Sequence, residues 1–392
     1  MSDSLYLAWR YMRHHKLKTA ILIGSVTLIL YLPLALQVLV DRATEQLSAR
    51  ARSTPLIVGA RGSAVELALS TLYFESRSPA PIRMAEVERI RATGLAAPIP
   101  MHVRFRVRNQ RIVGTTLDYF DFRGLRVGRG RPLAKLGECV LGAAAAAALQ
   151  AGPGDRVNSS SEALFDLAGV YPLRMRVVGV LERTHGPDDE AVFVDIKTAW
   201  IIEGLGHGHQ DLASVGAEGR VLERKDGRIV ANASVVQYTE ITAENEDSFH
   251  FHGDRSGFPL TAILALPPDD KSKTLLLGRY LGRDETSQVL EPVAVMEELV
   301  GTVARVRSWV IAAVVLVTLA TALTMVLVFW LSLRLRRREL ETMARIGCSR
   351  RTVASLVVCE IAVVFAFSVV LAGALTGVTS LYGPSLIRGL IL

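Results

Sequence analysis

The stretch RRRELETMARIGCSRR, from Arg336 to Arg351, is a short charged segment between two long apolar runs. A helix needs about 20 apolar residues to cross a bilayer, and the runs at 309–335 and 353–378 are both long enough. Another such run, at 20–40, lies near the start of the chain. The segment 336–352 is therefore predicted to be a loop that returns the chain to one membrane surface between two spans.

Composition agrees with a membrane protein. Half of the 392 residues are hydrophobic, which is high for a soluble protein. The first run has an apolar core longer than that of a cleaved secretory signal, so we expect an uncleaved span. The part at 41–308 reads as water-soluble and is long enough for a domain with its own core.

The positive charge is concentrated beside the spans. The net charge is +7, the segment before the first span contributes +3, and the loop between the other two contributes +5 when Arg334 at its edge is included. Cytoplasmic loops carry such an excess, so both segments are predicted to be cytoplasmic and 41–308 extracytoplasmic. The sequence thus predicts a multi-pass protein of the bacterial inner membrane with a cytoplasmic N-terminal helix at 1–19. This distribution argues against nucleic acid as a partner.

The extracytoplasmic part shows mixed secondary-structure patterns. Alternating or β-rich segments predict strands at 101–108, 173–182, 191–195, 233–241 and 260–266. A helix is predicted at 81–94, where Gly94 ends it, and another at the alanine run 143–148. The predicted fold class is a membrane α-helical bundle of three spans with a large α+β domain between the first and second.

Several segments, in their order along the chain, resemble the FtsX/MacB-type permeases of ABC transporters. The loop 336–351 resembles that family's loop between the second and third spans. The N-terminal LAWRYMRHHKLKTAILIGSVTL resembles its amphipathic helix and first span. In the extracytoplasmic part, the similar segments are DYFDFRGLRVGRGRPL, GECVLGAAAAAAL, GPGDRV and MRVVGVL. The family usually has four spans, and the tail 379–392 is too short to cross. We therefore expect a truncated fourth span, a final span that is supplied otherwise, or a member that works with three.

The resemblance implies a role for the loop. An exposed amphipathic helix between spans can dock into a groove of a soluble partner, and in this family the partner is a separate ATPase subunit. Gly347 would end that helix. The alternative is a basic loop on the membrane surface. The predicted coupling residues are Arg338, Glu339, Leu340, Met343, Ala344, Arg345, Ile346 and Gly347.

The chain contains no G-x-x-x-x-G-K-[S/T] phosphate-binding loop, so ATP and Mg²⁺ are expected on the partner and no enzymatic activity is expected here. We expect a permease homodimer or heterodimer in contact with membrane lipid, together with a periplasmic adaptor or cargo protein. The expected cargo is a lipoprotein, lipid, peptide, drug or metal-related species. The alternative function is a membrane-anchored sensor or regulator without transport.

Two H-x-H units suggest a metal site, since alternate residues of a strand share a face. His250 and His252 form one unit with Asp254 close by, and His207 and His209 form the other. Imidazole and carboxylate ligands suit zinc. The alternative is an exposed edge whose histidines bind nothing.

Glu360 lies within the third predicted span, where an ionisable side chain is costly and is by default a functional hypothesis. Its expected partner is Arg351 or an interfacial group, and a structural role is the alternative to a role in transport.

Overall fold

A computed structural model describes residues 2–74, 79–160, 172–208, 221–225, 228–231, 238–282, 284–335, 342, 345 and 349–391. The chain divides into two compact units. One, the helical unit, comprises Met1–Ala49 and Glu298–Leu392, and the other, the sheet unit, comprises Arg50–Glu297. This division places the predicted extracytoplasmic part, 41–308, in the sheet unit except for nine residues at its start and eleven at its end.

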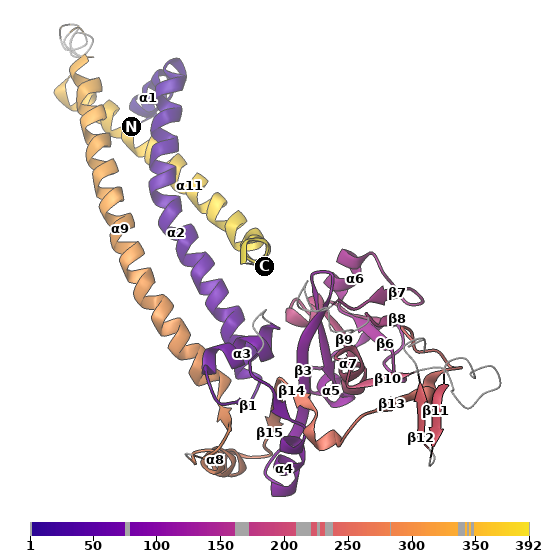
Figure 1. Ribbon diagram of the computed structural model, residues 1–392. Helices are drawn as coiled ribbons and strands as arrows, with labels where there is room; N and C mark the ends of the chain where they lie inside the picture. The colour runs from indigo at the N-terminus through magenta and orange to yellow at the C-terminus, as the bar shows by residue number, and fades with distance from the viewer. Residues whose placement is uncertain are drawn as a thin grey trace. The chain divides into compact units, whose positions relative to one another are not determined.

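Four helices form most of the helical unit (Figure 1). They are α1 (Ser2–His14), α2 (Lys16–Arg52), α9 (Pro292–Leu335) and α11 (Arg350–Ile391). In the described residues, two stretches are long and apolar enough to cross a membrane, Lys16–Arg42 and Ala354–Leu381, and they contain the first and nearly all of the third predicted spans. The predicted span 309–335 lies in α9, where the apolar stretch Ile311–Thr324 is shorter, so that span stays a prediction.

Helix α11 continues beyond the predicted end of the third span. The segment 379–392, predicted to be a separate tail too short to cross, contains Pro384, and yet the structure is helical as far as Ile391. A proline inside a helix removes one backbone hydrogen bond and does not by itself end the helix when its surroundings support it.

An apolar cluster and two hydroxyl contacts connect α11 to the N-terminal helices. Met12, Leu22 and Val364 form a buried apolar cluster. The Ser368 hydroxyl donates to the Ile23 carbonyl at 3.2 Å, and the Tyr31 and Thr379 hydroxyls lie 2.9 Å apart. Such contacts are typical of helices that pack inside a membrane, where interhelical hydrogen bonds and close packing replace the hydrophobic effect.

The sheet unit is built on a ten-stranded mixed sheet in the order β16-β1-β15-β3-β4-β9-β6-β8-β5, with β7 paired to β8. The pairs β4–β9 and β6–β8 are parallel and the other pairs are antiparallel. The strands are β1 (Leu56–Ala60), β3 (Ala97–Val107), β4 (Gln110–Thr115), β5 (Val127–Gly130), β6 (Glu138–Leu141), β7 (Arg156–Asn158), β8 (Arg174–Leu181), β9 (Ala191–Asp195), β15 (Ala262–Leu266) and β16 (Ser287–Leu290).

In the part of the chain that the structure describes, three two-stranded sheets accompany the large one. They pair β2 (Ile82–Arg83) with β14 (Pro259–Leu260), β10 (Gly206–Gly208) with β13 (Phe249–Phe251), and β11 (Val221–Lys225) with β12 (Arg228–Ala231). The helices described in this unit are α3 (Ala64–Tyr73), α4 (Ala85–Thr93), α5 (Leu117–Arg123), α6 (Ala143–Leu149), α7 (Ile196–Ile202) and α8 (Asp270–Arg279), with 3-10 turns η1 (Pro187–Glu190), η3 (Glu246–Ser248) and η4 (Arg255–Gly257).

The predicted α+β class is confirmed, and most predicted elements are present. The strand 191–195 is β9, and Gly94 ends α4 with a positive φ of 65°, which a residue without a Cβ adopts easily. The predicted strand 260–266 is divided into β14 and β15. Most of the predicted strand 233–241 lies outside the described residues, and its part at 238–241 forms only an isolated bridge through Glu240.

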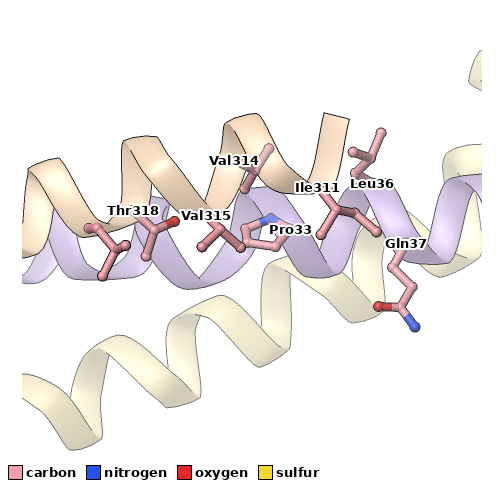
Figure 2. A pocket seen from close by; sticks show the side chains of 8 residues that line it. Pro33, Leu36, Gln37, Ile311, Val314, Val315 and Thr318 are labelled. Atoms are coloured by element: carbon pink, nitrogen blue, oxygen red, sulfur yellow. The ribbon is translucent and has the colours of Figure 1, made fainter. Parts of the chain in front are cut away.

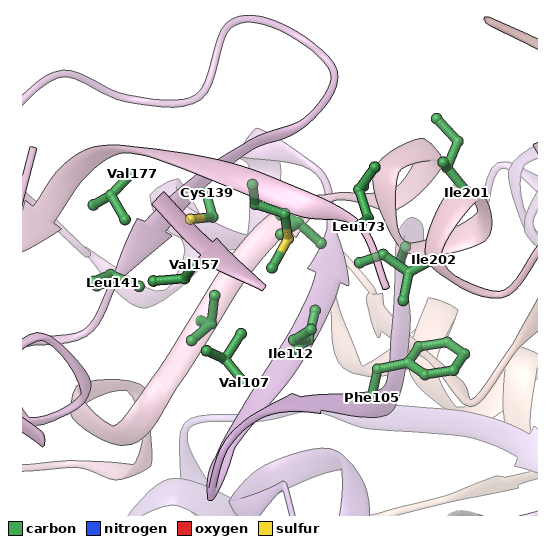
Figure 3. Close-up of a cluster of buried hydrophobic side chains, with 14 of the residues drawn as sticks. Phe105, Val107, Ile112, Cys139, Leu141, Val157, Leu173, Val177, Ile201 and Ile202 are labelled. Atoms are coloured by element: carbon green, nitrogen blue, oxygen red, sulfur yellow. The ribbon is translucent and has the colours of Figure 1, made fainter. Parts of the chain in front are cut away.

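Strand β9 is buried on both faces, which explains its continuous apolar sequence. On one face, Val192 and Val194 join a core cluster with residues of β3, β4, β6 and β8 (Figure 3). On the other face, the centroid of the Phe193 ring lies 5.3 Å from that of Phe120 and 5.7 Å from that of Tyr119, both in α5. Helix α5 is thereby fixed against the middle of the sheet.

Candidate functional site

The strands β10 and β13 pair so that three cross-strand neighbours face one another. Gly206 lies opposite Phe251, His207 opposite His250, and Gly208 opposite Phe249. Phe249 and Phe251 are half-buried and pack against the core, whereas His250 and His252 are exposed. The alternation expected from the sequence is therefore present, with the phenylalanines on the buried side and the histidines on the other.

The two glycines of β10 are required by the phenylalanines of β13. A Cβ on Gly206 would lie 2.7 Å from the Phe251 ring, and one on Gly208 would lie 2.5 Å from the Phe249 ring. Real side chains do not approach so closely, so a larger residue would force the strands apart or shift their register. The Phe–Gly contacts thus fix the register that sets His207 opposite His250.

Three histidines gather on this face, and we name them the histidine cluster: His207, His250 and His252. Each offers a ring nitrogen, and these nitrogens all lie within 4.8 Å of one another. The ring centroids of the three pairs are 4.7 to 5.0 Å apart. The backbone N–H of His252 donates to the Leu205 carbonyl at 3.1 Å, which holds the end of β13 beside β10.

The other two predicted metal ligands are Asp254 and His209. Asp254 is not one of the clustered ligands, because its carboxylate accepts from the Ser256 N–H at 3.0 Å and from the Ser256 hydroxyl at 2.5 Å as the N-cap of η4. These hydrogen bonds lower the pKa of Asp254. His209 lies outside the described residues.

A buried polar group at the end of α2 is a second candidate. Arg50 donates to both carboxylate oxygens of Asp188, at 2.6 and 2.9 Å, and also to the Tyr119 hydroxyl at 2.8 Å. Tyr119 donates to Asp188 at 2.7 Å. We call Arg50, Tyr119 and Asp188 the buried anchor. The Arg50 and Asp188 side chains are 10% and 4% exposed, which makes this a buried ion pair.

The buried anchor was not predicted from the sequence. Arg50 is one of several arginines in the segment that follows the first predicted span. Asp188 follows Gly-Pro in a loop, where acidic residues are ordinarily exposed. Nothing local distinguishes either residue, and only the packing of α5 on the sheet brings Tyr119 between them.

The charges of the buried anchor stabilise one another. Burial by itself raises the pKa of Asp188, but the charge of Arg50 and the hydrogen bonds from Arg50 and Tyr119 outweigh it, and the pKa of Asp188 is lowered. Burial likewise lowers the pKa of Arg50, but Tyr119 and Asp188 raise it, and the net change is a rise. The pair is therefore fully ionised at neutral pH.

We expect the contribution of Asp188 to stability to disappear in acid. Because its pKa is lowered on folding, the contribution is complete above its ordinary value of 3.8 and is lost as the pH falls through the lowered one. Thermal unfolding of the wild type and of Asp188→Asn, followed by near-ultraviolet circular dichroism, tests this. The wild type should be more stable at pH 7, and the difference should shrink below about pH 4. A difference independent of pH would contradict the expectation.

Glu360 is buried in the helical unit, at 5% exposure. Its Oε1 lies 3.8 Å from the Nζ of Lys18 at the start of α2. The side chain of Arg351, the partner expected in the loop, lies outside the described residues, so that pairing stays a prediction. An ion pair between α11 and α2 agrees with the structural reading of this glutamate, because intramembrane charges are typically paired inside a bundle.

The predicted coupling residues are described only at Arg345, which is helical and exposed. The other seven lie outside the described residues, so the amphipathic helix stays a prediction.

A pocket of about 250 Å³ lies between α2 and α9 (Figure 2). Pro33 and aliphatic side chains line most of it, and Gln37 and Thr318 are its polar members. None of its lining side chains titrates, so these side chains offer no general acid or base.

Two family models match the chain, one after the other. The model of the MacB-like periplasmic core domain matches residues 19–244, and that of the FtsX-like permease C-terminal part matches residues 311–383. No curated protein sequence matches the chain.

Solved structures similar to this chain share little sequence with it. The periplasmic region of MacB from Actinobacillus actinomycetemcomitans is 13% identical, with 64% of this chain and 97% of that region covered and a TM-score of 0.35. The extracellular domain of the noncanonic ABC-type transporter YknZ from Gram-positive bacteria is 12% identical, with 60% and 98% covered and a TM-score of 0.33. A domain of a permease protein from Porphyromonas gingivalis is 12% identical, with 55% and 78% covered and a TM-score of 0.25.

Proposed function

The chain belongs to the FtsX/MacB-type permeases of ABC transporters, and we propose that it converts ATP-driven movement of a separate ATPase subunit into movement of its periplasmic sheet unit. The observation that carries this proposal is the order of the two family matches on one chain. A MacB-like core at 19–244 precedes an FtsX-like part at 311–383, and the latter contains the predicted coupling loop. The chain is thus a membrane component of such a transporter, and ATP and Mg²⁺ are assigned to its partner.

The buried anchor supports the proposal at the periplasmic end. Helix α2 runs from Lys16 to Arg52 without a break, and Arg50 in its last turn belongs to the sheet unit. A displacement of that turn would have to separate Arg50 from Asp188 or move the loop that holds Asp188. Separating buried charges is costly, so the last turn of α2 and its sheet contacts should move together.

The contacts of α11 support the proposal at the other end of α2. This helix follows the predicted coupling loop directly, and it holds α1 and α2 through the Met12, Leu22 and Val364 cluster. Lys18 and Glu360 add an ion pair between α2 and α11. A push on the loop would therefore pass through α11 to α2, and along α2 to Arg50.

We propose that the working unit is a permease dimer with ATPase subunits on its cytoplasmic side. The N-terminus and the loop 336–352 face the cytoplasm in this arrangement, as their positive charge favours. The cargo is a lipoprotein, lipid, peptide, drug or metal-related species that is exported, or is extracted from the membrane with the help of a periplasmic adaptor.

We expect the full chain, purified in mild detergent from its own cell, to carry an ABC ATPase subunit with it. Mass spectrometry of the purified material identifies the partner, and ATP hydrolysis should appear only in preparations that contain it. An unrelated membrane protein with the same tag is the control. Recovery of the chain without any ATPase would contradict the transporter proposal and favour a membrane-anchored sensor.

A further inference from the structure

We propose that the histidine cluster binds a divalent first-row transition metal ion, of the class of Zn²⁺, on the sheet unit. The ligands are His207 of β10, His250 of β13, and His252, which directly follows β13. The inference does not depend on the transport function, because it rests on the geometry and chemistry of these three side chains.

The separations suit three nitrogens around one ion. Zinc–nitrogen bonds are about 2.0–2.1 Å long, so three tetrahedral nitrogen ligands lie roughly 3.3 Å apart. The ring nitrogens of the cluster already lie within 4.8 Å of one another. Two of the rings are exposed, so small side-chain rotations are enough to close the remaining distance without moving the backbone.

A hydrogen bond already orients one of the ligands. Nδ1 of His250 lies 3.0 Å from the Ser248 carbonyl oxygen. A carbonyl only accepts, so Nδ1 carries the proton and Nε2 presents its lone pair. Metal-bound histidines almost always donate their second ring nitrogen in this way, which fixes the tautomer and the ring orientation. This contact is independent of the clustering and supports a ligand role for His250.

The backbone holds the ligands in place before any ion binds. Gly206 and Gly208 admit the Phe251 and Phe249 rings on the buried side, and this register sets His207 opposite His250. The Leu205–His252 hydrogen bond fixes the third ligand. Because His207 and His250 lie in paired strands and the backbone of His252, directly after β13, is hydrogen-bonded to Leu205, little conformational entropy remains to be lost on binding.

The donor set selects the class of ion. Imidazole nitrogens suit zinc, copper and nickel, whereas magnesium and calcium require oxygen ligands. No carboxylate joins the cluster among the described residues. Three histidines leave a fourth tetrahedral position open, which is typical of sites whose metal also takes an external ligand. The ion would also join β10 to β13.

The test uses the full chain in detergent, stripped of metal with a chelator and then titrated with Zn²⁺ against a chromophoric chelator. We expect one Zn²⁺ per chain at the cluster. His207→Ala, His250→Ala and His252→Ala should each weaken Zn²⁺ binding at least about tenfold. Each removes a ligand, and even the loss of a residue that only orients a ligand costs about 10–100-fold. The matched control is His14→Ala, an exposed histidine of α1, which should bind as the wild type does.

Two further measurements keep a negative result interpretable. Cobalt(II) replaces zinc as a spectroscopic probe, and the wild type should show the visible absorption of tetrahedral coordination, which each cluster variant should lose. Cys139 is fully buried in the sheet unit, so its resistance to alkylation reports that a variant is folded. Folded variants that bind Zn²⁺ as tightly as the wild type, or a wild type that binds none, would overturn the proposal. Neither measurement involves ATP or a partner protein.

Discussion

The Asp188→Ala variant is expected to lose about 3–5 kcal/mol of the free energy of unfolding of its sheet unit. The substitution removes the carboxylate that accepts both hydrogen bonds from Arg50 at 2.6 and 2.9 Å. The guanidinium would then stay buried without a counter-charge, and its remaining acceptor among the described residues is the Tyr119 hydroxyl. An uncompensated buried charge is the main source of the loss.

Alkylation of Cys139 in increasing urea measures this effect, in a background where Cys348 and Cys359 are serine. Cys139 is buried in the sheet core, and burial, with a smaller contribution from Glu138, raises the pKa of its thiol, so it reacts only when the unit opens. The matched control is Glu88→Ala, which removes the partner of Arg91 in an ion pair whose side chains are 59% and 62% exposed. That change should lower the free energy of unfolding by about 1 kcal/mol or less.

The double variant Arg50→Met with Asp188→Leu distinguishes the loss of the ion pair from the cost of leaving one charge buried and unpaired. Replacing both partners by apolar side chains removes the buried charges together, so it should restore much of the stability that Asp188→Ala loses. Equal losses in Asp188→Ala and Glu88→Ala would show that the buried anchor does not hold the end of α2. In that case movement would have to reach the sheet unit by another connection.

The Glu339→Lys variant combined with Gly347→Pro should lose the ATPase subunit that the wild-type chain retains. The first change reverses a charge on the predicted coupling helix, and the second replaces the glycine expected to end it with a residue that fixes φ and has no N–H. Co-purification from the same cells, with the ATPase quantified relative to the permease, measures the loss. Because the loop is predicted to be the docking surface, we expect little ATPase to remain.

The control for this variant is Glu45→Lys, which makes the same charge change at an exposed position of α2 near the sheet unit and should leave the ATPase bound. The alternative interpretation, a basic loop on the membrane surface, makes the opposite prediction. An added lysine would strengthen attraction to anionic lipid and leave partner binding unchanged. Retention of the ATPase by the loop variant would therefore support that interpretation.

Much of the local structure could be predicted from residue patterns alone. The apolar runs predicted the helices at 20–40 and 353–378, because a span depends only on length and hydrophobicity. Strand β9 and the end of α4 at Gly94 also followed from local signals, an apolar β-branched run and a glycine that tolerates positive φ. The alternation of His250 with Phe249 and Phe251 placed the histidines on one face, since side chains of a strand alternate.

What the sequence left open is which distant segments meet. His207 and His250 face each other because phenylalanine rings of one strand fit over glycines of another, a match that depends on register and cannot be read from either segment alone. Asp254 satisfied the spacing of a ligand but is used locally as a helix cap. Arg50 and Asp188 are 138 residues apart and are brought together by the packing of α5 on β9. Local patterns determine which face of an element is buried, whereas its partner across the core depends on how all the buried faces pack at once.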